Sequence, residues 1–274
     1  MSYHQLIFEK DSGIGKITLS RPGSMNALTP ALLFELKEAF EKAGHDKDVA
    51  VTILTGAGRA FSAGVDLMFL RDRKLTDGRV GPVLDEPAHS VIETIQTIPK
   101  AVIAAVNGHC YAGALEIVLA CDLVIASEEA RFGDTHARWG IRPSWGMSQR
   151  LPRAVGFAKA KELSFTANIL TAHEAERIGL VNLVAPADRL SETAKEFARR
   201  IMSNSLQTVA AYKRLYNQTL RDMLQKGLEF EADTEFPISD TESRIGGFGK
   251  GKQPVFSSGG GFPDRDMPKR SSPE

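Results

Sequence analysis

The feature that most limits the fold of this chain is a repeated order of segments: an apolar strand, a glycine-containing turn and then a helix. Residues 49–55 are apolar and β-branched and end in a turn that contains three glycines. Residues 101–106 are apolar throughout, and they lead through Gly113 into an apolar helical stretch at 114–119 and a third strand at 123–126. Buried strands joined in this way form parallel sheets with right-handed crossovers. The chain therefore predicts an α/β fold with a mostly parallel sheet.

The remaining patterns predict one hairpin and further helices. Residues 6–10 and 16–20 alternate apolar and polar side chains around a turn, as a β-hairpin does. Thr29 and Pro30 have the residue types of an N-cap and a first helical position, for a helix at 30–43. Thr171 and Glu174 form a capping box for another helix. Further predicted segments are a charged, mobile loop at 71–87, helices at 89–97 and 156–165, and a strand at 180–184.

The pattern after residue 187 becomes helical and continues to residue 228, without the strand-like runs of the first part. Residues 257–274 are rich in Ser, Gly and Pro and hold few apolar side chains, which is typical of disorder. We therefore expect a core at 1–187, a C-terminal helical region at 188–256 and a disordered tail at 257–274.

Composition excludes several classes of protein. The 274 residues contain 34 Lys and Arg against 34 Asp and Glu, which argues against a nucleic-acid partner or a polybasic membrane anchor. No apolar run approaches the roughly 18 residues of a membrane helix. Cys110 and Cys121 lie among apolar residues and are expected to be free thiols. With neither a secretory signal at the first residues nor a peroxisomal tripeptide at the last, we expect a cytoplasmic location.

Two glycine-rich stretches fail as nucleotide sites. The first, at 56–61, has Phe61 where a dinucleotide-binding turn needs its third glycine. The second, at 246–253, ends in Gln253 where a phosphate-binding loop needs Ser or Thr. No two histidines lie four residues apart on a helical pattern, so the chain predicts no metal site.

The two strand-to-helix turns are better candidates for a functional site. A helix that begins near Gly113 directs free N–H groups outward, and the turn at Ala63-Gly64-Val65 offers a second N–H. Two converging amides form an oxyanion hole. Glu116 lies in the first turn of the same helix, where an acidic side chain either serves the site or only complements the helix dipole.

These segments resemble the signatures of a known family. Residues 61–67 (Phe-Ser-Ala-Gly-Val-Asp-Leu) resemble the first signature of the enoyl-CoA hydratase/isomerase, or crotonase, superfamily, and residues 104–108, 112–116 and 120–123 resemble the second. The resemblance covers residues 6–256. Its other motifs lie at Arg21-Pro22, 26–28, 140–143, 149–151, 175–181 and Phe248 with 254–256.

The resemblance implies a spiral of repeated β-β-α units, with a C-terminal helical oligomerisation region. It implies an acyl-CoA thioester substrate, so coenzyme A is part of the substrate and no separate cofactor is expected. The thioester oxygen would lie between the N–H groups of Val65 and Gly113, with Glu116 as the acid/base. It also implies a homotrimer or a dimer of trimers. Substrate contacts are expected from the first signature at Ala63, Gly64 and Asp66.

Two histidines extend the implied site. Hydratases of the family carry a second glutamate, and the matching position here holds His136. An imidazole can move a proton near neutral pH; the alternative is a polar residue that only lines the pocket. His89 matches the place of a catalytic histidine in aromatic dehalogenases of the family, but these need an acidic residue where this chain has Ser144. We expect His89 to lie on a helix face or in the pocket wall, and Trp139 or Trp145 to line the pocket with the loop at 71–87.

Cationic side chains are expected to contact the coenzyme A phosphates. Arg21 and Arg59 lie next to the motifs, and Lys250 or Lys252 is expected to reach a 3′-phosphate; each is otherwise a surface charge. The sequence as a whole predicts an enoyl-CoA hydratase that adds water to a 2-enoyl-CoA. The alternatives are an enoyl-CoA isomerase that uses one glutamate, and a catalytically impaired acyl-CoA-binding protein.

Overall fold

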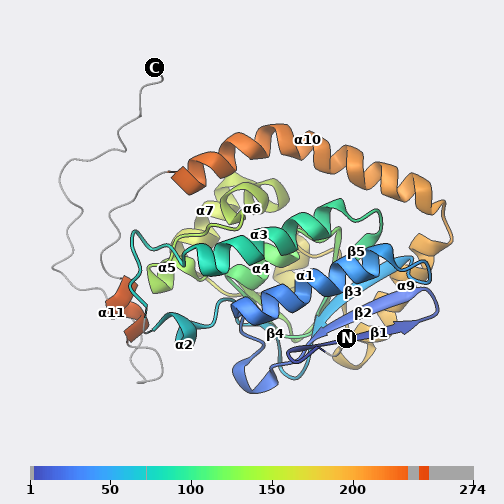
Figure 1. Ribbon diagram of the computed structural model, residues 1–274, viewed down its shortest axis with the longest axis horizontal. Coiled ribbons are helices and arrows are strands. Elements are labelled where there is room, and N and C mark those ends of the chain that lie inside the picture. Colours follow the sequence, from blue (N-terminus) through green and yellow to red (C-terminus); the bar gives the residue numbers. More distant parts are fainter. Residues whose placement is uncertain (1–2, 72, 234–240, 247–274) are drawn as a thin grey trace.

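The computed structural model describes residues 3–71, 73–233 and 241–246, and it shows two β-sheets with helices around them (Figure 1). Within these ranges the larger sheet has six strands in the order β1-β2-β3-β5-β7-β10, and the smaller has four in the order β4-β6-β8-β9. The strands are β1 (Leu6–Asp11), β2 (Ile14–Leu19), β3 (Val51–Gly56), β4 (Ala60–Ser62), β5 (Ala101–Val106), β6 (His109–Tyr111), β7 (Leu123–Ser127), β8 (Arg131–Gly133), β9 (Leu170–Thr171) and β10 (Leu183–Ala185).

Both sheets are mostly parallel. In the larger sheet β1 and β2 form the antiparallel hairpin, and β2, β3, β5, β7 and β10 then pair in parallel. In the smaller sheet β4, β6 and β8 are parallel and β9 is antiparallel to β8. Each of β3, β5 and β7 is followed by one short strand of the smaller sheet and then by a helix. These successive β-β-α units are the predicted crotonase-like spiral.

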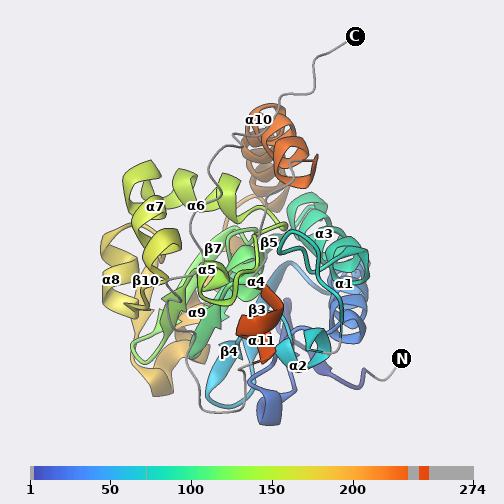
Figure 2. The same cartoon turned by 90° about the vertical axis from the view of Figure 1, so that its left-hand side faces the viewer.

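Helices cover both faces of the larger sheet. Helices α1 and α3 lie side by side against one face, where they bury a continuous apolar cluster, and α9 packs on the other face against β3, β5 and β7 (Figures 1 and 2). The helices are α1 (Pro30–His45), α2 (Leu67–Leu70), α3 (Pro82–Thr97), α4 (Gly113–Val118), α5 (His136–Trp139), α6 (Met147–Val155), α7 (Phe157–Thr166), α8 (Ala172–Arg177), α9 (Leu190–Met202), α10 (Leu206–Asp233) and α11 (Thr241–Gly246), with 3₁₀ turns η1 (Pro22–Ser24) and η2 (Ala187–Arg189).

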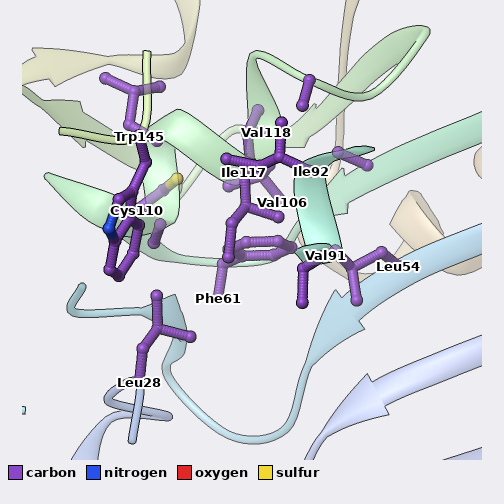
Figure 3. Close-up of a cluster of buried hydrophobic side chains, with 14 of the residues drawn as sticks. Leu28, Leu54, Phe61, Val91, Ile92, Val106, Cys110, Ile117, Val118 and Trp145 are labelled. Atoms are coloured by element: carbon purple, nitrogen blue, oxygen red, sulfur yellow. The ribbon is translucent and has the colours of Figure 1, made fainter. Parts of the chain in front are cut away.

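The main apolar core lies between the two sheets, α3 and α4. Phe61 of β4, Val106 of β5 and Ile117 of α4 are buried in it together, and Trp145 lies at the edge of the same cluster, near Cys110 (Figure 3). All six residues of α4 are buried. Burial on this scale contributes about 1.5–3 kcal/mol for each large apolar side chain, and it makes α4 a rigid support for the polar groups it carries.

Several local predictions are confirmed. The hairpin forms as β1 and β2, and Thr29 caps α1 by accepting a hydrogen bond from the N–H of Leu32 at 3.2 Å, with Pro30 as the first helical residue. Both hydrogen bonds of the capping box at Thr171 and Glu174 are present at α8. Capping side chains supply partners for helix-end amides that the backbone leaves free.

Other predictions are wrong. Residues 71–87 are not a loop throughout, because α3 begins at Pro82 and contains Pro87 in its interior. Pro82 suits a first helical position, and Pro87 removes only one backbone hydrogen bond near the start of a helix whose inner face is buried. The turn at 56–64 contains β4, a strand of the smaller sheet that the sequence did not indicate. The predicted tail and the motif residues Phe248 and 254–256 lie outside the described residues.

Helix α10 lies across one side of the molecule, above α3 and α6 (Figure 1). It is held by Lys213, whose buried Nζ donates to Asp122 Oδ2 at 2.8 Å, to the Ile95 carbonyl at 2.7 Å and to the Lys100 carbonyl at 2.9 Å. A charge buried with this many partners is stable inside a protein. None of the helices in the described ranges combines the length and apolarity needed to cross a bilayer.

Candidate active site

The fold brings Glu116 and His136 into contact. Glu116 lies in the first turn of α4, and His136 is the first residue of α5, directly after β8. Their side chains are 1% and 7% exposed, and His136 Nε2 lies 3.5 Å from Glu116 Oε2. Ionisable groups at this depth need partners, because burial without hydrogen bonds or opposite charge is costly. The two predicted acid/base residues therefore form one buried polar site.

Two backbone amides fix the other oxygen of Glu116. Its Oε1 accepts hydrogen bonds from the N–H of Trp145 at 3.0 Å and from the N–H of Met147 at 2.8 Å. Met147 is the first residue of α6, so its N–H has no acceptor within its own helix. The carboxylate is thus oriented at Oε1 by the backbone, and Oε2 is directed at His136.

The segment 144–147 that supplies these amides is itself held from α3 and α6. Asp85 Oδ1 of α3 accepts from Ser144 Oγ at 2.7 Å and from Trp145 Nε1 at 2.8 Å. Arg150 Nη1 donates to the Trp145 carbonyl at 2.8 Å. His89 Nε2 lies 2.6 Å from the Ser144 carbonyl, to which it donates. Three side chains thus position the backbone that positions Glu116.

His136 has a second carboxylate partner, which the sequence reasoning missed. Its Nδ1 lies 2.6 Å from Asp134 Oδ1, and Asp134 Oδ2 accepts a hydrogen bond from Ser164 Oγ of α7, also at 2.6 Å. An ionised carboxylate only accepts, so Nδ1 carries the proton. The four side chains form a chain of polar contacts in the order Ser164, Asp134, His136, Glu116.

The electrostatics of these contacts favour a charged imidazole. Burial lowers the pKa of His136, but hydrogen bonds to Asp134 and Glu116 and the charges of both carboxylates outweigh it and raise that pKa to about 10. Burial also raises the pKa of Asp134, but the hydrogen bond and the charge of His136, with the Ser164 hydroxyl, bring it below its usual value. The raised pKa of His136 therefore favours the protonated imidazole at neutral pH.

The two predicted oxyanion-hole amides lie close together and are unused. A Cβ added to Gly64 would lie 3.4 Å from the Gly113 nitrogen and 2.7 Å from the Tyr111 carbonyl oxygen, and Gly64 has φ +87°, so only glycine suits this turn. The Gly64 carbonyl accepts from Leu28 N–H, which turns the N–H of Val65 away from Leu28. Within the described ranges, neither Val65 N–H nor Gly113 N–H donates to a protein acceptor.

The backbone at the start of α4 is strained. Ala112 has φ 46° and ψ −118°, a conformation that costs about 1–3 kcal/mol for a residue with a side chain. Its carbonyl accepts the first hydrogen bond of α4, from Glu116 N–H at 3.1 Å, so the Gly113 N–H points out of the helix. Gly113 is also packed against Trp145, since an added Cβ would lie 2.4 Å from Trp145 Cζ3. Strain at this position fits a group held ready for a ligand.

The residues predicted to contact substrate have different surroundings in the structure. Arg21 pairs with Asp66 at 3.2 Å and also contacts the Ala27 carbonyl, while Asp66 Oδ1 caps α2 through the N–H groups of Met68 and Phe69. Arg21 and Asp66 thus pair with each other next to the Ala63–Val65 turn, and their contact with a substrate stays a prediction. Arg59 is exposed, and Trp139 is half-buried against the core.

His89 lies on a helix face, one of the two positions expected for it. Its side chain lies on the exposed side of α3, and its Nε2 donates a hydrogen bond to the Ser144 carbonyl. Trp145, which was expected in the pocket wall, is 2% exposed and packed between Asp85 and Gly113. Lys250 and Lys252 lie outside the described residues. In the described part of the chain, no three His, Cys, Asp or Glu side chains are grouped to hold a metal ion.

Comparisons with known proteins find related sequences and solved structures of similar fold. A family model described as enoyl-CoA hydratase/isomerase matches residues 9–258. A short-chain-enoyl-CoA hydratase from Clostridium acetobutylicum is 37% identical over 245 residues, which cover 89% of this chain and 93% of that protein. The crystal structure of an enoyl-CoA hydratase from Mycobacterium tuberculosis has 38% identity and a TM-score of 0.74, covering 84% of this chain and 96% of the other. A monofunctional enoyl-CoA isomerase from M. smegmatis has 33% identity and a TM-score of 0.68, covering 82% and 97%.

Proposed function

The chain belongs to the enoyl-CoA hydratase/isomerase family, and from that premise we propose that it is an enoyl-CoA hydratase that adds water to the double bond of a 2-enoyl-CoA. The observation that carries the proposal is the contact between Glu116 and His136 beside two backbone amides that have no protein acceptor. A hydratase needs a base for water, an acid for the α-carbon and donors for the thioester oxygen. These four groups supply all three.

The reaction begins with the thioester oxygen between the N–H groups of Val65 and Gly113. Glu116 takes a proton from water as the water oxygen bonds to the β-carbon. The electron pair of the double bond moves toward the carbonyl, and the enolate oxygen is stabilised by the two amides. One such donor is worth about 10²–10³ in rate. Because Ala112 and Gly64 already hold the amides in place, the charge develops without reorganisation of the backbone.

The second half returns the electron pair to carbon. His136 Nε2–H gives its proton to the α-carbon as the enolate collapses to a 3-hydroxyacyl-CoA. Glu116 now carries the proton from water and His136 is neutral. The 3.5 Å between Glu116 Oε2 and His136 Nε2 lets that proton pass to the imidazole, which restores the starting state. The imidazolium thus replaces the second carboxylic acid of the hydratase pattern.

Double-bond isomerisation is the second candidate. It needs one group to move a proton between two carbons, and Glu116 is the one glutamate that matches the hydratase pattern. The similarity to a solved isomerase also favours it. In that reaction His136 would only orient Glu116.

One assay separates the candidates. The protein is mixed with crotonoyl-CoA and, separately, with a 3-enoyl-CoA, and the absorbance of the conjugated thioester is followed. Hydration removes the absorbance of crotonoyl-CoA. Isomerisation creates absorbance from the 3-enoyl-CoA. Binding of both esters with no change in absorbance would contradict both reactions and support an acyl-CoA-binding protein.

We also propose a homotrimer or dimer of trimers, as the family resemblance implies. Tyr212, Leu215 and Tyr216 of α10 are more than half exposed, at 54%, 62% and 66%. Apolar side chains that cluster in this way on a helix are typical of a surface that another subunit covers. Light scattering at micromolar concentration tests this, and a stable monomer would contradict it. The free thiols of Cys110 and Cys121 support the proposed cytoplasmic location.

A further inference from the structure

Asp134 is a buried carboxylate that the proposed reaction does not use. It is 3% exposed, and both of its oxygens are occupied. Oδ1 accepts from the ring Nδ1 of His136 at 2.6 Å and from the backbone N–H of His136 at 3.3 Å, and Oδ2 accepts from Ser164 Oγ at 2.6 Å. A surface helix, α7, therefore fixes the carboxylate that fixes the imidazole.

We propose that Asp134, held by Ser164, is a positioning residue that keeps the His136 ring in one orientation, with Nε2–H directed at Glu116. Because Asp134 occupies Nδ1, only Nε2 is available to Glu116 and to a substrate. A ring flip would place a carbon against Asp134 and lose its 2.6 Å hydrogen bond inside the protein. Such a loss is costly where water is absent to replace the partner.

The geometry explains how an imidazole serves where the family pattern has a carboxylic acid. A glutamic acid brings its own proton when neutral, whereas an imidazole donates from Nε2 only in the tautomer or charge state that its other nitrogen allows. Asp134 imposes that state from the far side of the ring. The inference rests on the proposed function for its effect on rate, but the state of the His136 ring is measurable without turnover.

The charged groups around His136 come from α4, α5, α7 and α11 and from the end of β8. Only Glu116 and Asp134 form ion pairs with the ring in the part of the chain that the structure describes. Arg138 of α5 donates to the Ala167 carbonyl at 3.0 Å, and Lys159 of α7 pairs with Glu162 at 2.6 Å. Lys161 and Glu162 on α7 and Glu242 on α11 are exposed.

The test uses Asp134→Asn as the main variant, Ser164→Ala as a milder one and Asp122→Asn as the control. Asparagine keeps the shape and an acceptor but removes the charge. Ser164→Ala leaves the Asp134 charge and removes one hydrogen bond. Asp122 also pairs with a buried cation, Lys213 at 2.8 Å, but lies outside the site, so its variant controls for the loss of a buried ion pair.

The first readout is the titration of His136, followed by ¹H–¹³C spectra of ring-labelled histidine and assigned with a His136→Gln variant. We expect wild-type His136 to stay protonated well above pH 7. In Asp134→Asn its titration should move to lower pH by about one to three pH units, the usual effect of an opposite charge at contact. Ser164→Ala should move it in the same direction by less, and Asp122→Asn should leave it unchanged.

The second readout is the pH profile of kcat/KM on a 2-enoyl-CoA. The alkaline limit of activity should move to lower pH in Asp134→Asn with KM nearly unchanged. A uniform loss of kcat at every pH with an unmoved limit would overturn the inference and leave Asp134 a structural residue. Wild-type His136 that titrates at or below pH 6.5 would also overturn it, even if Asp134→Asn does not fold. If His136 titrates as expected but the wild type does not hydrate, the inference stands and the proposed function fails.

Discussion

Replacing Glu116 with glutamine should stop turnover and leave the fold intact. The Oε1 atom accepts from the N–H groups of Trp145 and Met147, and a glutamine Oε1 is able to accept both. Glu116→Ala leaves both amides buried without an acceptor, at a cost of about 1–3 kcal/mol each. The glutamine variant avoids this cost, and Asp134 still pairs with His136. The comparison of the two variants therefore separates the chemical role of Glu116 from its structural one.

The expected loss in rate follows from the role of Glu116 as the base. General acid–base catalysis contributes about 10²–10⁴ in rate, which corresponds to a barrier higher by about 3–5 kcal/mol. Glu116→Gln should lower kcat for hydration of crotonoyl-CoA by this factor. The affinity for a CoA ester, measured by calorimetry, should change by less than about threefold, because the oxyanion-hole amides are untouched.

Three measurements are needed: the absorbance of the conjugated thioester for kcat, calorimetry for binding, and thermal unfolding for stability. Wild type and Glu116→Ala are measured in the same way, as the two references for the glutamine variant. A fall in kcat of less than threefold in Glu116→Gln would refute the assignment of Glu116 as the base. A parallel loss of binding and thermal stability would show instead that Glu116 mainly supports the fold.

Three further outcomes are expected. Gly113→Ala should destabilise the fold by about 1–3 kcal/mol and lower kcat, because its Cβ would lie 2.4 Å from Trp145. An unfolding free energy and a kcat equal to those of wild type would contradict the close packing of Gly113 against Trp145. Asp85→Ala should lower kcat about 10- to 100-fold with little change in KM, since it frees the segment that orients Glu116; a wild-type kcat would contradict that role. The pKa of His136 is raised to about 10, so the protonated ring should stabilise the fold fully below pH 6.5. Between pH 6.5 and 10 the free energy of unfolding should fall by about 1.4 kcal/mol per pH unit as this contribution is lost. Denaturant unfolding should show this slope for wild type and not for His136→Gln.

The fold could be predicted where the signal is local. Residues 101–106 are apolar over a whole strand, and the turns that follow such strands carry glycines, so the parallel sheet and the positions of Val65 and Gly113 follow from the sequence. The strands of the smaller sheet have only two or three residues, which is too short for a pattern of alternating side chains. The start of α3 was missed because Pro87 indicates a break, although the helix passes through it.

The candidate site could be predicted only in part. Glu116 stands next to a recognisable turn, and His136 came from comparison with the family pattern. The residues that position them are distant in sequence: Trp145 is 29 residues from Glu116, and Asp85 is 60 residues from Trp145. No spacing rule links such positions. Asp134 could have been predicted from the sequence, because a carboxylate two residues before a histidine is able to reach its ring.

The rate of hydration by His136→Ala, compared with wild type and His136→Glu, tests the central claim most directly. If His136 supplies the proton to the α-carbon, alanine should lower kcat/KM on a 2-enoyl-CoA by about 10²–10⁴, and glutamic acid, the residue type of the hydratase pattern, should restore much of it. The same pair of variants should leave CoA-ester binding nearly unchanged. Efficient hydration by wild type with the same rate and the same pH profile in His136→Ala would contradict the claim and leave His136 a wall of the pocket.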